Sequence, residues 1–179
     1  MLQITIPDKE YWDARSEQFV NRKGQALCLE HSLVSLSKWE SKFHKPFLSS
    51  NEKTTEEVLY YIKCMTITQN VDDSVYELLT RENFKEINDY IADPMTATTI
   101  TEHTGRKSRE IITSEVIYYW MIALGIPFKC EKWHLNRLLM LINVCNIKNQ
   151  PNKKMSKAQT MKSNAALNAI RRQQMHSKG

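Results

Sequence analysis

The sequence predicts a mainly α fold: a compact helical domain with a small N-terminal antiparallel β element and a basic C-terminal helix. Glycine is scarce, with 4 in 179 residues, whereas an all-β sandwich normally needs many glycine-containing turns. Apolar residues recur at three- and four-residue spacing over most of the chain, which is the period of a helix. Apolar side chains make up 41% of the sequence, enough for one core.

The N-terminal stretch predicts the β element. Leu2, Ile4 and Ile6 alternate with polar residues, which is the period of a half-buried strand. A loop containing residues 21–24 leads to a second short apolar run over residues 25–30. We expect the two runs to pair as antiparallel strands and to lie on the helices, because two strands alone are marginal in water.

Several helices are expected between residues 32 and 94, each with its own start or stop signal. These signals are, in chain order, Ser32 as an N-cap with Pro46 as a stop, a capping box at Thr54 and Glu57, an opening at Asp72 and Asp73, and Thr80 as an N-cap with Pro94 as a stop. Residues 95–110 are polar and β-branched, which predicts a loop or a short strand.

Two further helices, at about 114–124 and 130–146, are predicted to form a central hairpin that supplies most of the core. Gly125 and Pro127 end the first of them, and the second is expected to begin at about Lys129. The candidate core residues of the whole chain are Leu36, Trp39, Ile62, Phe84, Ile87, Tyr119, Trp120, Trp133, Leu138 and Ile142.

Pro151 marks the predicted boundary between a helical core domain with its β hairpin, residues 1–150, and a basic helical tail, residues 151–179. Charge is divided unevenly, since the last acidic residue is Glu131. Residues 1–131 hold 15 basic and 20 acidic side chains, and residues 132–179 hold 10 basic and no acidic ones. Ser156 is expected to cap the tail helix, which has good helix propensity but a weak apolar stripe. Such a tail is typical of a segment that meets an acidic or amphipathic partner.

Catalytic and metal chemistry find little support in the sequence. Cys130 and His134 are four residues apart on a predicted helix, but a full zinc ligand set is missing. Cys28 and His31 are close in sequence without a nucleophile elbow around either, and the scattered glycines form no phosphate loop. The four cysteines contain no CxxC pair and are expected to be free thiols in the core. We therefore expect no enzyme activity, no catalytic residue, no metal and no cofactor.

The basic tail is the candidate partner-binding segment. Its candidate residues are Lys153, Lys154, Lys157, Met161, Lys162, Ala165, Arg171 and Arg172. No aromatic residue follows Trp133, which disfavours base stacking on nucleic acid. A helix that docks on a protein partner is favoured, while a merely solvated tail remains an alternative. No secretory signal or membrane-length apolar run is present, so a cytoplasmic protein is expected.

Several strings are distinctive enough to suggest a family. They cover residues 29–43 (LEHSLVSLSKWESKF), 45–48 (KPFL), 94–98 (PMTAT), 109–113 (REIIT), 118–121 (YYWM), 130–139 (CEKWHLNRLL), 164–168 (NAALN) and the terminal Lys178-Gly179. With these strings the chain resembles, over nearly its whole length, the tail assembly chaperones of long-tailed, siphovirus-like bacteriophages.

The resemblance implies a protein of the host cell cytoplasm that coats the tape-measure protein and keeps this helical rod soluble while the tail-tube protein polymerises around it. The implied partners are thus the tape-measure and tail-tube proteins, and self-association into a homo-oligomer is compatible with this role. It implies absence from the mature virion, no catalytic residues and no membrane. The alternative is a structural virion protein of the neck or baseplate; the second alternative is nonspecific nucleic-acid binding, which the diffuse basic residues disfavour.

Overall fold

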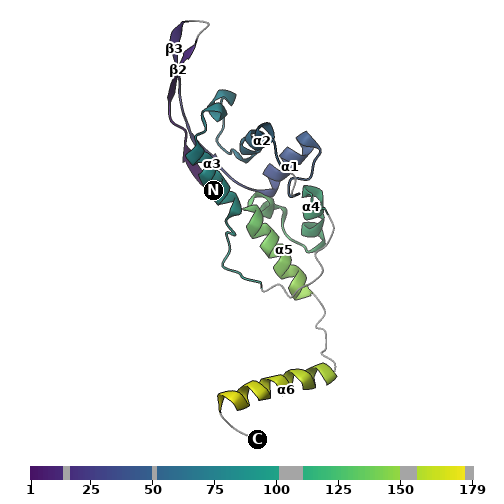
Figure 1. Ribbon diagram of the computed structural model, residues 1–179. Helices are drawn as coiled ribbons and strands as arrows, with labels where there is room; N and C mark the ends of the chain where they lie inside the picture. Colours follow the sequence, from purple (N-terminus) through teal and green to yellow (C-terminus); the bar gives the residue numbers. More distant parts are fainter. Residues whose placement is uncertain (14–16, 50–51, 101–110, 150–156, 176–179) are drawn as a thin grey trace. The chain divides into compact units, whose positions relative to one another are not determined.

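Helices make up most of the described chain (Figure 1), as the sequence predicts. The structure is a computed structural model that describes residues 1–13, 17–49, 52–100, 111–149 and 157–175. By its internal contacts the chain divides into two units, Met1–Asn146 and Ile147–Gly179. No helix among the described residues is both long and apolar enough to cross a membrane.

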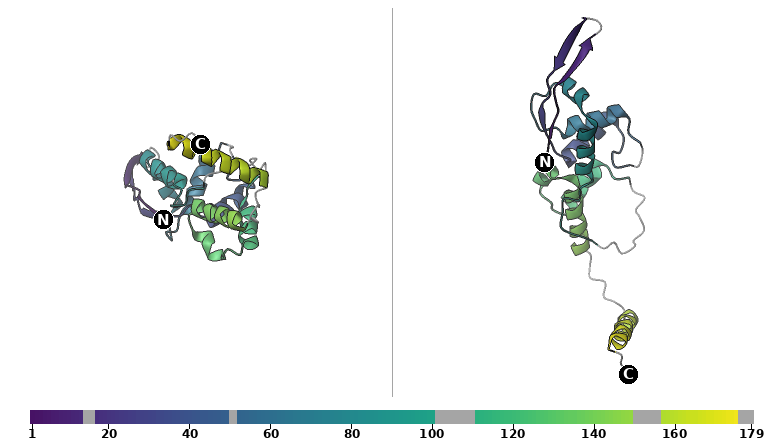
Figure 2. Two further views of the ribbon diagram at one scale, coloured as in Figure 1. Left: turned by 90° about the horizontal axis from the view of Figure 1, so that it is seen from below. Right: turned by 60° about the vertical axis from the view of Figure 1, so that its left-hand side comes forward.

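The predicted β element is confirmed and pairs β1 (Leu2–Thr5) with β4 (Ala26–Leu29) in antiparallel register. Ile4 lies opposite Leu27, and both side chains are buried. Helix α3 (Arg81–Ala92) contacts β1, as Figure 1 and the right-hand view of Figure 2 both show. The two strands are therefore supported by a helix, as a two-stranded sheet in water requires.

A second hairpin lies between these strands, where the sequence analysis expected none. Strands β2 (Lys9–Asp13) and β3 (Gln18–Arg22) pair antiparallel, so the loop predicted from residue 21 starts two residues too early. Gly24 follows β3 at a place where the backbone comes very close to β1. A Cβ atom at this position would lie 1.9 Å from the carbonyl oxygen of Ile6, so no larger residue fits without a backbone shift.

The helices are α1 (Leu33–Phe43), α2 (Thr55–Met65), the 3₁₀ helix η1 (Asp73–Leu78), α3, α4 (Ser114–Ala123), the 3₁₀ helix η2 (Phe128–Lys132), α5 (Leu135–Asn149) and α6 (Lys157–Gln174). The first four begin where the capping signals predict. The hydroxyls of Ser32, Thr54 and Thr80 each accept a backbone N–H of the first turn, and Asp72 caps η1. Ser156 lies outside the described residues. Residues 95–100 form no helix or strand, and residues 101–110 are not described.

The helix predicted from about Lys129 is wrong at its start. Residues 128–132 form η2, Trp133 is extended, and α5 begins only at Leu135. The reason is a long-range backbone contact: His134 forms a β-bridge with Ser32, and the amide of Leu135 donates to the carbonyl of His31 at 2.7 Å. This pairing takes the backbone out of the helical conformation for two residues.

Helices α4 and α5 share one cluster, but the prediction that they supply most of the core is wrong, because the core has two clusters and α1 contributes to both. The first cluster contains Trp39 and joins α1 to β1, β4, α2, η1 and α3. The second contains Leu33 and Leu36 and joins α1 to α4, η2 and α5. Helices α4 and α5 thus supply one cluster, whereas α1 is the element that the two clusters share.

Most candidate core residues lie in these clusters. Those that are buried are Leu36, Trp39, Ile62, Ile87, Leu138 and Ile142, and those that are half-buried at a cluster edge are Phe84, Trp120 and Trp133. Tyr119 is a correction, since 66% of its surface is exposed. Helix α4 is apolar on all sides, and its buried row is Ile117 and Met121, which leaves Tyr119 facing outward.

Candidate partner-binding surfaces

The predicted tail residues lie on or next to α6, which is described by itself. Lys153 and Lys154 lie outside the described residues, and Lys157 is the first residue of α6. The remaining candidates, Met161, Lys162, Ala165, Arg171 and Arg172, are all exposed. The described part of the chain therefore presents these five side chains to solvent, without bringing them together on one side of the helix.

Helix α6 has two different apolar sides. Met161 and Ile170 are nine residues apart, which places them on opposite sides of a helix with 3.6 residues per turn. Ala165 lies with Met161, whereas Leu167 lies with Ile170. Leu167 and Ile170 are half-exposed and larger than alanine. Neither residue is among the predicted partner-binding residues, although their three-residue spacing is visible in the sequence.

Helix α4 is held in place at its amino end by a buried carboxylate from α1. Glu40 Oε2 accepts the backbone N–H of Ser114 at 2.7 Å, and Glu40 Oε1 accepts that of Phe47 at 2.8 Å. Thr113 makes no side-chain cap bond, so Glu40 takes over the capping role, and negative charge is favoured at a helix amino end. Gly125, with a φ of +65°, ends the helix in the left-handed conformation that suits glycine.

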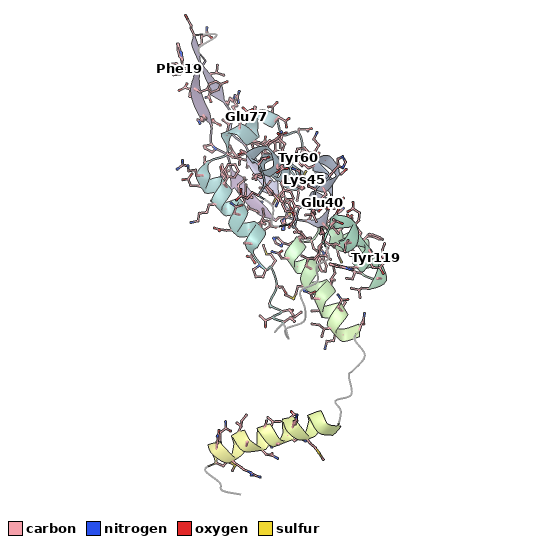
Figure 3. The ribbon with its side chains drawn as sticks, turned by 45° about the vertical axis from the view of Figure 1, so that its right-hand side comes forward. Phe19, Glu40, Lys45, Tyr60, Glu77 and Tyr119 are labelled. Atoms are coloured by element: carbon pink, nitrogen blue, oxygen red, sulfur yellow. The ribbon has the colours of Figure 1, made fainter. Side chains whose placement is uncertain are left out.

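The outer side of α4 is apolar although it faces solvent. Tyr119 and Ile122 are 66% and 64% exposed, and Ile111 before the helix and Phe128 in η2 are exposed as well. Figure 3 shows Tyr119 pointing away from the core. Glu115 is the single charged residue of the helix. We call Tyr119, Ile122 and Phe128 the α4 face; an exposed row of this kind is typical of a protein-binding surface.

The β2–β3 hairpin carries a second exposed aromatic pair. Trp12 lies opposite Phe19 across the two strands, with their ring centroids 5.0 Å apart in an edge-to-face arrangement. Both side chains are exposed, and Figure 3 shows Phe19 on the hairpin beyond the helices of this unit. The hairpin is tied to η1 by Arg22, which pairs with Glu77 and also lies over the Tyr11 ring. Hydrogen bonding to Glu77 raises the pKa of Arg22, so this link stays charged.

Two histidines meet in the core where the two clusters join. The His31 and His134 rings are 5.1 Å apart, and His31 Nδ1 is hydrogen-bonded to the Tyr61 hydroxyl at 2.6 Å. His134 Nε2 donates to the carbonyl of Tyr90 at 3.0 Å. Burial, together with the neighbouring His134, lowers the pKa of His31 to about 4. The hydrogen bond to Tyr61 thus ties the segment between β4 and α1 to α2, and the ring contact packs it against His134, just before α5.

The cysteines do not combine with these histidines. Cys28, close to His31 in sequence, has its Sγ 3.9 Å from Met1 Sδ instead. All four cysteines are free; Cys64 and Cys130 are buried and the other two are half-buried. Burial raises the pKa of the Cys64 thiol to about 11, so it is a poor nucleophile at neutral pH. Among the described residues, no three metal-ligating side chains are grouped together.

The remaining strong polar contacts of the first unit hold its elements together. Lys45 Nζ lies 2.7 Å from Glu57 Oε1, and this hydrogen bond lowers the pKa of the Glu57 carboxyl. Figure 3 labels Lys45 beside the helices that it links. Tyr118 donates to Glu131 at 2.9 Å, and burial, aided by this bond, raises the pKa of Tyr118 to about 12. The exposed apolar rows and the side chains of Lys162, Arg171 and Arg172 take no part in these contacts.

Comparison with known proteins adds no family to these observations. No family model, no curated protein and no solved structure matches the chain.

Proposed function

We propose that this protein is a tail assembly chaperone of a long-tailed bacteriophage, which binds the tape-measure protein in the host cytoplasm and keeps it soluble during tail-tube polymerisation. The family resemblance of the sequence strings suggests the client. The observation that carries the proposal is the α4 face, where Tyr119 and Ile122, three residues apart on α4, are exposed, as is Phe128 on η2.

The α4 face has the chemistry that a long helical client requires. A helical rod exposes apolar rows that aggregate unless another apolar surface covers them, and a helix is commonly bound by such a row. The face is held on a rigid support, because Glu40 fixes the start of α4 and Ile117 and Met121 fix its inner side. A small apolar face without charged partners gives modest affinity, and modest affinity permits displacement when the tube protein arrives.

The proposal is tested by co-expressing the full chain with a segment of the tape-measure protein and measuring the soluble fraction of that segment. Ile122→Ser is expected to lower the soluble fraction several-fold. The matched control is Ile67→Ser, which changes an isoleucine that is 50% exposed outside the α4 face. Both variants should retain the melting temperature of the parent, since neither side chain is in the core.

Two results would count against the proposal. One is equal loss of tape-measure solubility with Ile122→Ser and Ile67→Ser, because the α4 face would then have no special role. The other is recovery of the protein in abundance from purified mature virions by mass spectrometry. That second result would favour a permanent structural component over a chaperone that leaves.

A further inference from the structure

A groove between α2 and η1 has aromatic walls and an acidic rim. Its volume is about 450 Å³, and it is lined by Leu59, Tyr60 and Tyr76, by the carboxylates Glu56, Asp73 and Glu77, and by Lys63, which lies over the Tyr76 ring. Figure 3 labels Tyr60 and Glu77, which come from these two elements. Tyr60 is fixed by an edge-to-face contact with Phe43 of α1, with ring centroids 5.4 Å apart. The groove is thus a formed feature of the first unit.

Acidic charge exceeds basic charge around this groove. The lining holds three carboxylates, Glu56, Asp73 and Glu77, and one cation, Lys63. Lys63 is already paired with Asp73 at 2.9 Å, and Arg22 is paired with Glu77. Glu56 is exposed and has no ion pair among the described residues. A groove with apolar side chains and, among the described residues, one unpaired carboxylate, Glu56, favours a basic amphipathic partner.

The same chain carries a helix with the complementary pattern. On α6, Leu167, Ile170, Arg171 and Gln174 occupy positions i, i+3, i+4 and i+7, the spacing with which a helix lies in a groove. The charged residues of α6 are all basic, and its described side chains, residues 161–175, are exposed. A helix without an apolar surface to pack on is marginal in water. Docking would therefore stabilise α6 as well as fill the groove.

The direction of α5 favours a groove on another molecule. Within the first unit, which ends at residue 146, α5 runs away from α2, as Figure 1 and the right-hand view of Figure 2 show. The chain thus leaves the first unit on the side away from its own groove. The groove of a second copy does not depend on where the chain leaves the first unit.

We propose that α6 of one copy docks in the α2–η1 groove of a second copy. Leu167 and Ile170 pack against the half-buried Leu59 and Tyr60, and Arg171 faces Glu56. Each copy then offers a helix at one end of the contact and a groove at the other, so association is heterologous and copies add head to tail. The groove is separate from the α4 face, so this inference stands or falls independently of the chaperone function.

The test uses two full-length variants that each block one half of the contact. Leu167→Ser combined with Ile170→Ser removes the apolar contacts of α6, and Glu56→Lys reverses the charge at the rim. We expect the parent chain to self-associate in sedimentation velocity at 50 mM salt and more weakly at 500 mM, because exposed charges are screened. Each blocked variant should self-associate at least roughly tenfold more weakly.

Mixing the two blocked variants gives the decisive measurement. The groove-blocked chain retains an intact α6, and the tail-blocked chain retains an intact groove, so the mixture should form a complex that neither variant forms alone. The complex also shows that each blocked variant is folded in the half that was left unchanged. Failure of the mixture to associate, while the parent does associate, would overturn the proposal.

Matched controls separate this contact from a general effect of charge or apolarity. Arg172→Glu changes the neighbouring arginine on the other side of α6, Met161→Ser removes an exposed apolar side chain there, and Glu86→Lys reverses an exposed acid on α3. All three should retain parental self-association. Equal weakening by Arg171→Glu and Arg172→Glu would contradict the docked geometry.

Two other occupants are distinguished in the same experiment. A parent chain that stays monomeric at both salt concentrations would overturn the proposal, since α6 would then dock on its own molecule or not at all. Nucleic acid is tested by adding a labelled duplex DNA. One outcome is that the chain stays monomeric, binds the duplex, and loses this binding equally with Arg171→Glu and Arg172→Glu. In that case α6 binds nucleic acid, and the docking proposal fails.

Discussion

At the scale of single residues, buried polar groups with specific partners hold the fold in place. Glu40 is the clearest case, because its two carboxylate oxygens accept backbone amides from Phe47 and Ser114. Phe47 lies just after α1, whereas Ser114 begins α4, 74 residues after Glu40 in the chain. A group of this kind fixes the position of two elements at once, and its loss leaves buried donors without acceptors.

Replacement of Glu40 tests this role. Glu40→Gln keeps the shape but offers an amide NH₂ where one carboxylate oxygen stood, so one of the two backbone N–H groups loses its acceptor. We expect the free energy of unfolding to fall by about 1–3 kcal/mol in urea denaturation. The matched control Glu86→Gln, at an exposed position of α3, should stay within about 0.5 kcal/mol of the parent. A similar loss in both variants would contradict the role given to Glu40.

The buried histidine makes stability depend on pH. The pKa of His31 is lowered to about 4 in the folded chain, whereas an imidazole in the unfolded chain titrates near pH 6.5. Below pH 6.5 the unfolded state therefore binds more protons, and stability falls as pH is lowered toward 4. The cost amounts to about 3 kcal/mol over this window.

Urea denaturation between pH 7 and pH 4 measures this dependence. In His31→Asn the imidazole is absent, so the part of the pH dependence that comes from His31 should disappear, although the variant is less stable at pH 7. His134, the neighbouring ring, remains in both proteins. An unchanged slope in the variant would show that other groups cause the acid sensitivity.

At the scale of elements, α4 has a buried side and an exposed side, and the residues on both sides are apolar. Met121 is fully buried, and the next residue, Ile122, is 64% exposed. Met121→Ala should lower the free energy of unfolding by about 2–5 kcal/mol, because a buried side chain is lost from the second cluster. Ile122→Ala should change it by less than about 0.5 kcal/mol. Thermal unfolding of the two variants measures the difference, and equal losses would contradict the orientation of α4.

The β2–β3 hairpin and the start of α5 both depend on contacts with residues that are distant in sequence. Residues 9–13 and 18–22 pair as strands, although polar residues interrupt both runs and no strong turn signal lies between them. Helix α5 starts at Leu135 because His134 bridges to Ser32. Neither outcome is encoded by the local period of apolar residues, since each depends on backbone partners elsewhere in the chain.

At the scale of the whole molecule, the chain divides into two units with different sources of stability. The first contains both core clusters, and the second contains α6 with no buried side chain among those described. A chain ending at Asn149 should therefore unfold, at low protein concentration, with a free energy within about 0.5 kcal/mol of the full chain. Chemical denaturation followed by tryptophan fluorescence reports this, because all tryptophans precede Asn149. A large loss would mean that α6 contributes to the core.

The sequence by itself determined what local chemistry decides. The caps at Ser32, Thr54 and Thr80, the stops at Pro46 and Pro94, and the pairing of β1 with β4 were all predictable, because a cap bonds amides within three residues and alternation marks a half-buried strand. The exposure of α6 side chains also follows from its sparse apolar residues. These predictions needed only neighbours in the chain.

Tertiary structure alone decided which surfaces are buried and which are free for partners. Tyr119 was expected in the core, because a helix that is apolar all round gives no period by which to choose its inner side. The choice was made by α1, which packs against α4 and serves both clusters. The α2–η1 groove and the contact of His31 with His134 likewise join segments far apart in sequence. Burial is a property of packed pairs of elements, so the pattern of one element cannot specify it.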